Sequence, residues 1–332
     1  MDSTPEQLRF ASIPGCIIRA DFAGGGLSSD LGPLLLKGVD RQIGLTERVC
    51  AAIDDTRHPG YITHTLHDIL RQRIYQIASG YEDGNDCNSL RHDPVFRLGV
   101  GGKPFDTDDT EGALASGSTI SRFEHAVSSK DIYRLSEALV DQFIAGYATP
   151  PEALVLDIDH SEDAAYGQQP LAFYNHHYQS TCYLPLMVFE GLSGALVAAV
   201  LRPGKRPTGA ENAMILKRVL KRIREHFPHT HILVRGDGHF STPELMAMID
   251  AMDNTDFIFG LPSNAVINRL AEPAEQRACA LWAKVQTQEV VPDAVRLYEE
   301  FRYAAATWHK PLRVVQKAEI MGLGENPRFV VT

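Results

Sequence analysis

The sequence predicts an α/β protein: a helical N-terminal domain followed by a mixed β-sheet with flanking helices and a strand-rich insertion. Up to residue 148, apolar residues recur at the three- and four-residue spacing of amphipathic helices. After Pro150 and Pro151, short apolar runs of strand length alternate with longer helical stretches. The 332 residues also exceed what one domain of about 150 residues needs. We therefore expect two domains, residues 1–148 and 149–332.

The N-terminal half is predicted to be all-helical after an irregular segment that ends near residue 26. A helix start is expected between Ser28 and Asp30, and helical spacing continues to about Ile53. The spacing resumes at His64, and Gly80 is expected to end that second stretch. The remaining expectations are a short helical unit over residues 86–101, a loop over 101–110 and one or two helices over 116–147.

The second half is predicted to form strands with a parallel component, because helices separate several of them. The expected strands cover residues 152–159, 183–190, 195–201, 231–237, 256–262, 296–305, 312–320 and 329–332. The second and third strands are expected to form an antiparallel hairpin around the turn Gly191–Gly194. The expected helices cover residues 209–226, 242–252 and 271–285. In the first of these helices, the residues expected to face the core are Met214, Ile215, Val219, Leu220 and Ile223.

The composition excludes several classes of protein. No window approaches the roughly 18 consecutive apolar residues of a membrane span, and the start lacks a signal-peptide pattern, so we expect a cytoplasmic protein with no membrane partner. The five cysteines are scattered without a Cys-x-x-Cys pair, which favours reduced thiols over a zinc or redox site. The net charge of −10 argues against a uniformly basic nucleic-acid binder. Basic residues nevertheless cluster between Arg202 and Arg224.

Acidic residues follow two of the predicted strands. Asp157 and Asp159 close the strand over 152–159, and Asp237 closes the strand over 231–237. Carboxylates at the ends of neighbouring strands can hold two divalent ions about 4 Å apart for phosphodiester cleavage. Mg²⁺ suits such a site because it accepts a few carboxylates together with substrate phosphates. The alternative is that these aspartates only form turns or cap helices.

Three stretches carry a resemblance to a known family: residues 155–213, 232–246 and 257–266. They resemble the DDE domain of one group of insertion-sequence transposases, which is RNase H-like. In that group the first catalytic aspartate lies in an Asp-x-Thr-like turn and the second in Arg-Gly-Asp-x-x-Phe. The resemblance implies that Asp159 and Asp237 are catalytic metal ligands. Asp157 is a further candidate ligand because of its position near the end of the same strand. It extends over residues 71–96, 301–320 and 326–332, and so covers essentially the whole chain.

The resemblance also implies cofactors and partners. The complete family uses two Mg²⁺ ions, for which Mn²⁺ is a substitute. The expected partners are the terminal inverted repeats of the element, target DNA and further copies of the chain in a homodimer or higher synaptic complex.

The chain departs from the family pattern at two places. The family supplies a third carboxylate from a helix with a Gln-x-Glu-Asn-x-Ile-Lys-like motif after the last strand, and nothing here matches that motif. Glu211-Asn212 precedes Asp237 in the chain and does not qualify. The glutamates Glu299, Glu300, Glu319 and Glu325 lie in the region that resembles the inserted strand-rich segment. We therefore expect an RNase H-like domain truncated at its C-terminus and inactive as this chain alone. The second departure is His160-Ser161, which replaces a small residue and threonine.

The basic cluster offers the best DNA contacts in the sequence. The candidates, which could follow a phosphate strand, are Lys205, Arg206, Lys217, Arg218, Lys221 and Arg222. An ordinary solvated helix face explains them almost equally well. Weaker candidates are four arginines of the helical domain for recognition of DNA ends, a pair of histidines in a loop as DNA or metal contacts, and one histidine beside Asp237 for proton transfer. These residues are Arg71, Arg73, Arg91, Arg97, His176, His177 and His239.

Two other functions remain open on the sequence. The chain could be a catalytically dead DNA-binding regulator of intact transposase. It could also be an RNase H-like nuclease that uses Asp157, Asp159, Asp237 and a local glutamate.

Overall fold

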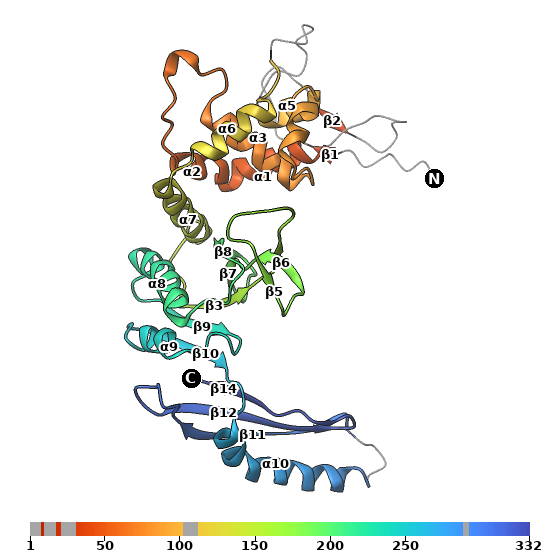
Figure 1. Ribbon diagram of the computed structural model, residues 1–332, viewed down its shortest axis with the longest axis vertical. Helices are drawn as coiled ribbons and strands as arrows, with labels where there is room; N and C mark the ends of the chain where they lie inside the picture. The colour runs from red at the N-terminus through yellow and green to blue at the C-terminus, as the bar shows by residue number, and fades with distance from the viewer. Residues whose placement is uncertain (1–7, 10–17, 21–30, 102–111, 288–291) are drawn as a thin grey trace. The chain divides into compact units, whose positions relative to one another are not determined.

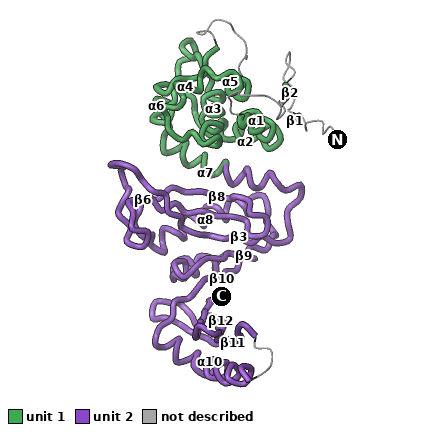
Figure 2. The backbone as a smooth tube through the Cα atoms, turned by 90° about the vertical axis from the view of Figure 1, so that its right-hand side faces the viewer, with its two compact units in different colours: residues 1–138 green, residues 139–332 purple. Residues whose placement is uncertain are grey.

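The computed structural model describes residues 8–9, 18–20, 31–101, 112–287 and 292–332. The chain divides into two compact units, residues 1–138 and 139–332 (Figure 2). The division falls inside helix α7, and each unit has its own hydrophobic core.

The first unit is built mainly from helices (Figure 1). Its helices are α1 (Gly32–Ile43), α2 (Leu45–Ala51), α3 (Leu66–Ala78), α4 (Cys87–Leu90), α5 (Pro94–Val100), α6 (Gly117–Ala126) and α7 (Ser129–Ile144), with 3₁₀ turns η1 (Pro59–Tyr61) and η2 (Gly84–Asp86). Side-chain caps fix several starts: Thr65 accepts a hydrogen bond from the Asp68 N–H, and Asp93 accepts one from the Phe96 N–H.

Two expectations for this unit need correction. The helical spacing between residues 30 and 53 is interrupted at Gly44, whose φ of 67° is left-handed and separates α1 from α2. The segment before residue 26, which was predicted to be irregular, contains a strand pair, because β1 (Leu8–Arg9) pairs antiparallel with β2 (Arg19–Ala20). The helix start predicted between Ser28 and Asp30, and nearly all of the loop predicted over residues 101–110, lie outside the described residues.

The second unit is a mixed α/β domain. Its main strands are β3 (Ala153–His160), β7 (Leu186–Glu190), β8 (Leu196–Val200), β9 (His231–Gly236), β10 (Thr255–Gly260), β11 (Ala294–Tyr303), β12 (Leu312–Met321), β13 (Gly324–Glu325) and β14 (Arg328–Val331). Its helices are α8 (Gly209–His226), α9 (Pro243–Asp250) and α10 (Ala265–Val285). A capping box of Thr208 and Glu211 starts α8, and Pro243 occupies the first turn of α9.

These nine main strands form one large sheet in the order β11-β12-β14-β10-β9-β3-β7-β8, with β13 on β12 (Figure 1). β9 runs parallel to both β3 and β10, whereas β7 and β8 form the predicted antiparallel hairpin. The five strands β8-β7-β3-β9-β10 have the order and polarity of an RNase H-like sheet. The predicted α/β class with a helical N-terminal part is confirmed.

One hydrophobic core joins the sheet to its helices. Leu154, Leu156 and Ile158 alternate along β3 toward this core, where they share one cluster with side chains of α8 and α9. A second cluster packs Ala274 and Ala278 of α10 against β12. At β3 the sheet therefore has one face covered by helices, and the β3 residues that alternate with Leu154, Leu156 and Ile158 point to the other face.

One expectation for the second unit was wrong, and one feature of it was not predicted. Met214 is 51% exposed rather than in the core, whereas Leu216 fills the core position of that turn. The segment between β3 and β7 also forms a small sheet that the sequence did not predict. It consists of β4 (Asp163–Ala164), β5 (Phe173–Asn175) and β6 (Ser180–Tyr183) in the order β4-β6-β5. Its strands are two to four residues long, which is too short for a periodic pattern.

Candidate metal-binding site at the ends of β3 and β9

The alternation along β3 decides where its acidic residues point. Leu156 and Ile158 are buried, so Asp157 and Asp159 lie on the opposite face of the strand. Asp159 is exposed, and the next residue, His160, returns to the buried side. The hydrophobic pattern of the strand thus directs two carboxylates away from the core.

The pairing of β3 with β9 brings the second acidic position close. In this parallel ladder Asp157 pairs with Arg235 and Ile158 pairs with Gly236. Asp159 and Asp237 each follow one residue beyond the last pair, on strands that lie about 4.8 Å apart. The side chain of Asp237 is 54% exposed. The structure therefore places the two predicted ligands, Asp159 and Asp237, at adjacent strand ends.

Each of these carboxylates uses one oxygen to shape its own turn. Oδ1 of Asp159 accepts a hydrogen bond from the His160 N–H at 2.8 Å. Oδ1 of Asp237 accepts one from the His239 N–H at 2.9 Å, and Nδ1 of His239 lies 3.3 Å from its Oδ2. These contacts orient both side chains while leaving them at the surface.

Asp157 is engaged differently. Its Oδ1 and Oδ2 accept hydrogen bonds from Nε and Nη2 of Arg235 at 2.6 and 2.7 Å. This two-bond pair raises the pKa of the arginine, and it neutralises the carboxylate. Gly191 lies against the pair, because a Cβ there would be 2.6 Å from Asp157 Oδ2 and 2.7 Å from Arg235 Nη2. A metal ion at Asp157 would have to compete with Arg235.

A ring stack joins the two acidic turns on the buried side. The His160 imidazole stacks on Phe240 with centroids 4.8 Å apart and planes 6° apart. Phe240 is fully buried and also contacts Phe259. Nε2 of His160 lies 3.3 Å from Oδ1 of the buried Asn212. Burial, together with the positive charge of Arg202, lowers the pKa of His160.

The residues of the Arg-Gly-Asp-x-x-Phe segment, Arg235 to Phe240, hold the acidic turns in place. Arg235 binds Asp157, and Gly236 makes room for the ring of Phe240, because a Cβ at Gly236 would lie 2.8 Å from that ring. Phe240 in turn supports His160 of the first motif. The sequence identified these positions only by resemblance, and it gave no signal for Asn212.

A cleft of about 740 Å³ begins at Asp237 and Gly238. Glu275 of α10, Glu325 of β13 and Arg328 of β14 also line it. Burial, and then the charge of Glu325, raise the pKa of Glu275. Two glutamates that are distant in sequence therefore share a cleft with Asp237. Even so, the described residues contain no group of three or more His, Cys, Asp or Glu side chains suited to a metal ion.

The other glutamates considered in the sequence have structural partners. Glu299 pairs with Arg277, and Glu300 pairs with Arg313. Glu319 is buried between Arg296 and Lys317. These three side chains stabilise the β11–β12 region and its contact with α10.

The predicted DNA-contact residues fall into two groups. Lys205, Arg206, Lys217, Arg218 and Lys221 are exposed. Lys205 also lies 4.3 Å above the Phe173 ring. Arg222 instead donates to both carboxylate oxygens of Asp141 and to Glu225. Arg224, from the same cluster, donates to backbone carbonyls that include those of Thr230 and Asn254. Part of the basic cluster therefore holds the fold together.

The weaker candidates also have local contacts. His176 and His177 lie in the turn between β5 and β6, with their rings against Tyr174 and Tyr178. In the first unit, Arg71 and Arg73 donate to backbone carbonyls of Val100 and Glu82, and Arg97 is buried. Arg91 lines a pocket of the first unit.

A sheet with this strand order places the second unit in the RNase H-like class of α/β domains. The chain belongs to the family of transposase DDE domains, group 1, whose model matches residues 10–332. DDE transposases generally use divalent metal ions. The search of curated proteins found no match.

One solved structure with a similar chain is the piggyBac transposase, in a cryo-electron microscopy structure of its synaptic complex with hairpin DNA. The TM-score is 0.42 and the sequence identity is 14%. The match covers 91% of this chain and 61% of that chain, so this chain spans less than two thirds of the piggyBac protein. Separately, no helix in the described part of the chain has the length and apolar character needed to span a membrane.

Proposed function

We propose that the protein is a DNA transposase of an insertion sequence whose strand-cleavage site contains Asp159 and Asp237. The observation that carries this proposal is the parallel β3–β9 ladder, which ends one residue before each aspartate. Family membership over residues 10–332 supports the same reading.

The donor set fits a divalent ion. Asp159 and Asp237 offer exposed carboxylate oxygens, which are the ligands that Mg²⁺ and Mn²⁺ accept. Asp159 and Asp237 would hold the metal, with Asp157 as a further ligand when Arg235 releases it. The bound ions would activate water and stabilise charge at the reacting phosphate. The His160–Phe240 stack positions both acidic turns from the core side.

Asp159 and Asp237 would be two of the three carboxylates that the family uses. We propose that this chain alone does not cleave DNA, because its sequence contains no match to the motif that supplies the family's third carboxylate. Its DNA partners would be the terminal inverted repeats and target DNA, with exposed Lys217 and Lys221 of α8 contacting phosphates. We further propose that the helical unit contributes DNA-end recognition and dimer contacts, and that the protein acts in the cytoplasm.

Calorimetric titration of the whole chain with Mn²⁺ tests the metal site directly. Asp159→Asn and Asp237→Asn should each weaken Mn²⁺ binding by about tenfold or more. Asp163→Asn is the matched control, because Asp163 is an exposed strand aspartate on the separate small sheet. Equal affinities in all four proteins would contradict the proposal.

A nicking assay separates the remaining functions. Plasmid DNA that carries the element's ends is incubated with the chain in Mg²⁺, and the proposal expects binding without cleavage. The second candidate function is a nuclease that uses a local glutamate, and the cleft shared by Asp237, Glu275 and Glu325 favours it. Cleavage that is independent of the element's ends and is lost in Glu275→Gln or Glu325→Gln would establish that nuclease instead.

A further inference from the structure

The first unit contains a pocket that the proposed cleavage site does not use. It has a volume of about 510 Å³, within the range of about 300–1,000 Å³ that holds small ligands. The segment that follows α2, the η1 turn and the start of α3 form one wall, and α6 forms another. All of its lining residues belong to the first unit.

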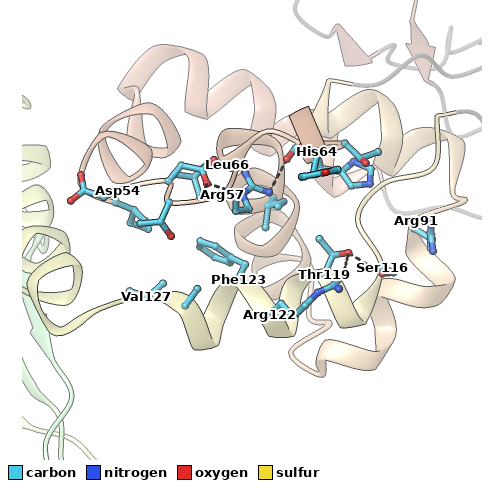
Figure 3. Close-up of a pocket in the computed structure, with 17 residues that line it drawn as sticks. Asp54, Arg57, His64, Leu66, Arg91, Ser116, Thr119, Arg122, Phe123 and Val127 are labelled. Carbon is cyan, nitrogen blue, oxygen red and sulfur yellow. Dashed lines mark hydrogen bonds and ion pairs between the residues drawn. The ribbon is translucent and has the colours of Figure 1, made fainter. Parts of the chain in front are cut away.

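The pocket has a cationic end and an apolar end. In Figure 3, Arg91, Arg122, Ser116 and Thr119 gather toward one end, with His64 nearby, whereas Phe123 and Val127 lie toward the other. Hydroxyls and guanidinium groups are the usual partners of phosphate oxygens. The apolar end offers the edge or face of an aromatic ring to a flat ligand.

The acidic residues of the pocket are already neutralised. Asp55 pairs with Arg57, which also donates to the His64 carbonyl. Asp54 pairs with Arg134 at 2.7 Å. Among the described residues, by contrast, neither Arg91 nor Arg122 has a carboxylate partner. Two uncompensated guanidinium groups therefore remain at one end.

Arg91 gives an independent indication of a ligand. Its Nε is buried and has no hydrogen-bond partner in the described structure. A buried donor without a partner costs free energy, and such groups in native proteins usually have a reason. An anionic oxygen that enters from the pocket would satisfy it.

An aromatic side chain stands at the pocket rim. Tyr61 lies on the η1 turn, lines the pocket and is 87% exposed. Its ring is tilted by 46° against that of His58, which supports it from one side. Exposed aromatic rings beside cationic groups form the stacking platforms of proteins that bind single-stranded nucleic acids.

From this arrangement we propose that the pocket holds one unpaired nucleotide of a DNA strand, with its phosphate at Arg91 and Arg122 and its base toward Phe123 and Tyr61. A base pair inside a duplex is stacked on both sides and cannot enter. The inference rests on the proposed function for its choice of DNA, and it adds a site for an unpaired strand to that function.

Binding of the whole chain to a labelled DNA strand, measured by fluorescence anisotropy in EDTA, tests the proposal. The probe is a labelled single strand of roughly 12 nucleotides, within the site size of such proteins. Arg122→Ala should weaken binding about tenfold and reduce the slope of log affinity against log salt by about 0.7, because one phosphate contact is lost. Tyr61→Ala should weaken binding about fivefold or more and leave that slope unchanged, because stacking is not electrostatic.

Lys130→Ala is the matched control, since it removes one exposed positive charge from the same unit outside the pocket. The proposal expects this variant to bind the single strand almost as tightly as the wild type does. It also expects the protein to bind the single strand more tightly than a duplex of the same sequence. Thymidine 5′-monophosphate should compete with the strand better than inorganic phosphate does. Equal losses in Arg122→Ala and Lys130→Ala, equal binding of single strand and duplex, or equal competition by the two small anions would each overturn it.

The outcome is separable from that of the cleavage site. EDTA removes any contribution of metal, and Asp159→Asn and Asp237→Asn should bind the strand normally. If Arg122→Ala binds the single strand as tightly as the wild type while Mn²⁺ binding depends on Asp159 and Asp237, only the proposal of a nucleotide pocket is refuted. If Asp159→Asn and Asp237→Asn bind Mn²⁺ as tightly as the wild type while Arg122→Ala weakens strand binding, only the proposal of a metal site is refuted.

Discussion

His160 and Phe240 stack with their ring planes only 6° apart, although 80 residues separate them in the sequence. His160 directly follows Asp159, and Phe240 is three residues after Asp237. The stack therefore connects the turn at the end of β3 to the turn at the end of β9 from beneath. His160 therefore acts as an aromatic spacer on the core side of the candidate metal site.

His160→Ala should lower the free energy of unfolding by about 1–2 kcal/mol, because it removes an aromatic pair and leaves a gap beside Phe240. His160→Phe should retain most of the stability, since a second aromatic ring preserves the stack. Urea unfolding midpoints of the two variants measure the difference. Equal midpoints for alanine and phenylalanine would show that the stack contributes nothing.

Gly191→Ala should open the Asp157–Arg235 pair, because the new Cβ would lie within 2.7 Å of both side chains. The pair is partly exposed and therefore screened by solvent, so we expect a loss of about 1 kcal/mol. The same substitution in an Asp157→Ala/Arg235→Ala background should cost clearly less, because the side chains that clash are absent. A double-mutant cycle by chemical denaturation measures this difference, and identical costs in the two backgrounds would contradict the steric explanation.

Arg222 and Lys221 should behave differently, although they are neighbours on α8. Arg222→Ala should lower stability by about 1 kcal/mol, because Arg222 binds both oxygens of Asp141. Lys221→Ala should leave stability unchanged and reduce the salt slope of duplex DNA binding by about 1. Thermal unfolding and salt-dependent binding of the two variants test this division. A larger DNA-binding loss in Arg222→Ala than in Lys221→Ala would reverse the assignment.

Glu319 should make the stability of the protein sensitive to acid. Hydrogen bonds from Lys317 and then Arg296 lower the pKa of this buried carboxyl from 4.5 to about 2. A carboxyl with a lowered pKa in the folded state stabilises the protein above pH 4.5, and this contribution is lost as the pH falls from 4.5 toward 2.

Glu319→Gln should therefore be less stable than the wild type at pH 7, and its unfolding midpoint should change less between pH 5 and about pH 3. The matched control is Glu300→Gln, because Glu300 also pairs with an arginine but is 61% exposed. Midpoints measured by circular dichroism at several pH values compare the three proteins. The same acid sensitivity in the wild type and in Glu319→Gln would rule out this role for Glu319.

The sequence by itself determined most of the regular elements. The helix predicted over 209–226 matches α8, because its capping box and apolar spacing are encoded within a few neighbouring residues. The alternation of apolar and polar residues along β3 is likewise local, and it places Asp157 and Asp159 on one face. Strands of two residues such as β4 were not predictable, because they are too short to show a periodic pattern. The interruption at Gly44 was not predictable either, because a single residue can end a helix without changing the spacing of the apolar residues around it.

The tertiary structure decided which charged groups are committed to partners. Arg235 and Asp157 are 78 residues apart, and Arg222 and Asp141 are 81 residues apart, yet both pairs form two-bond contacts. The cleft that joins Asp237 to Glu275 and Glu325, and the pocket around Arg91 and Arg122, arise in the same way. Hydrophobic periodicity depends on neighbours within a few residues, so the sequence displays it directly. Ion pairs and pockets depend on which elements the folded chain brings together, and only the packed structure fixes that.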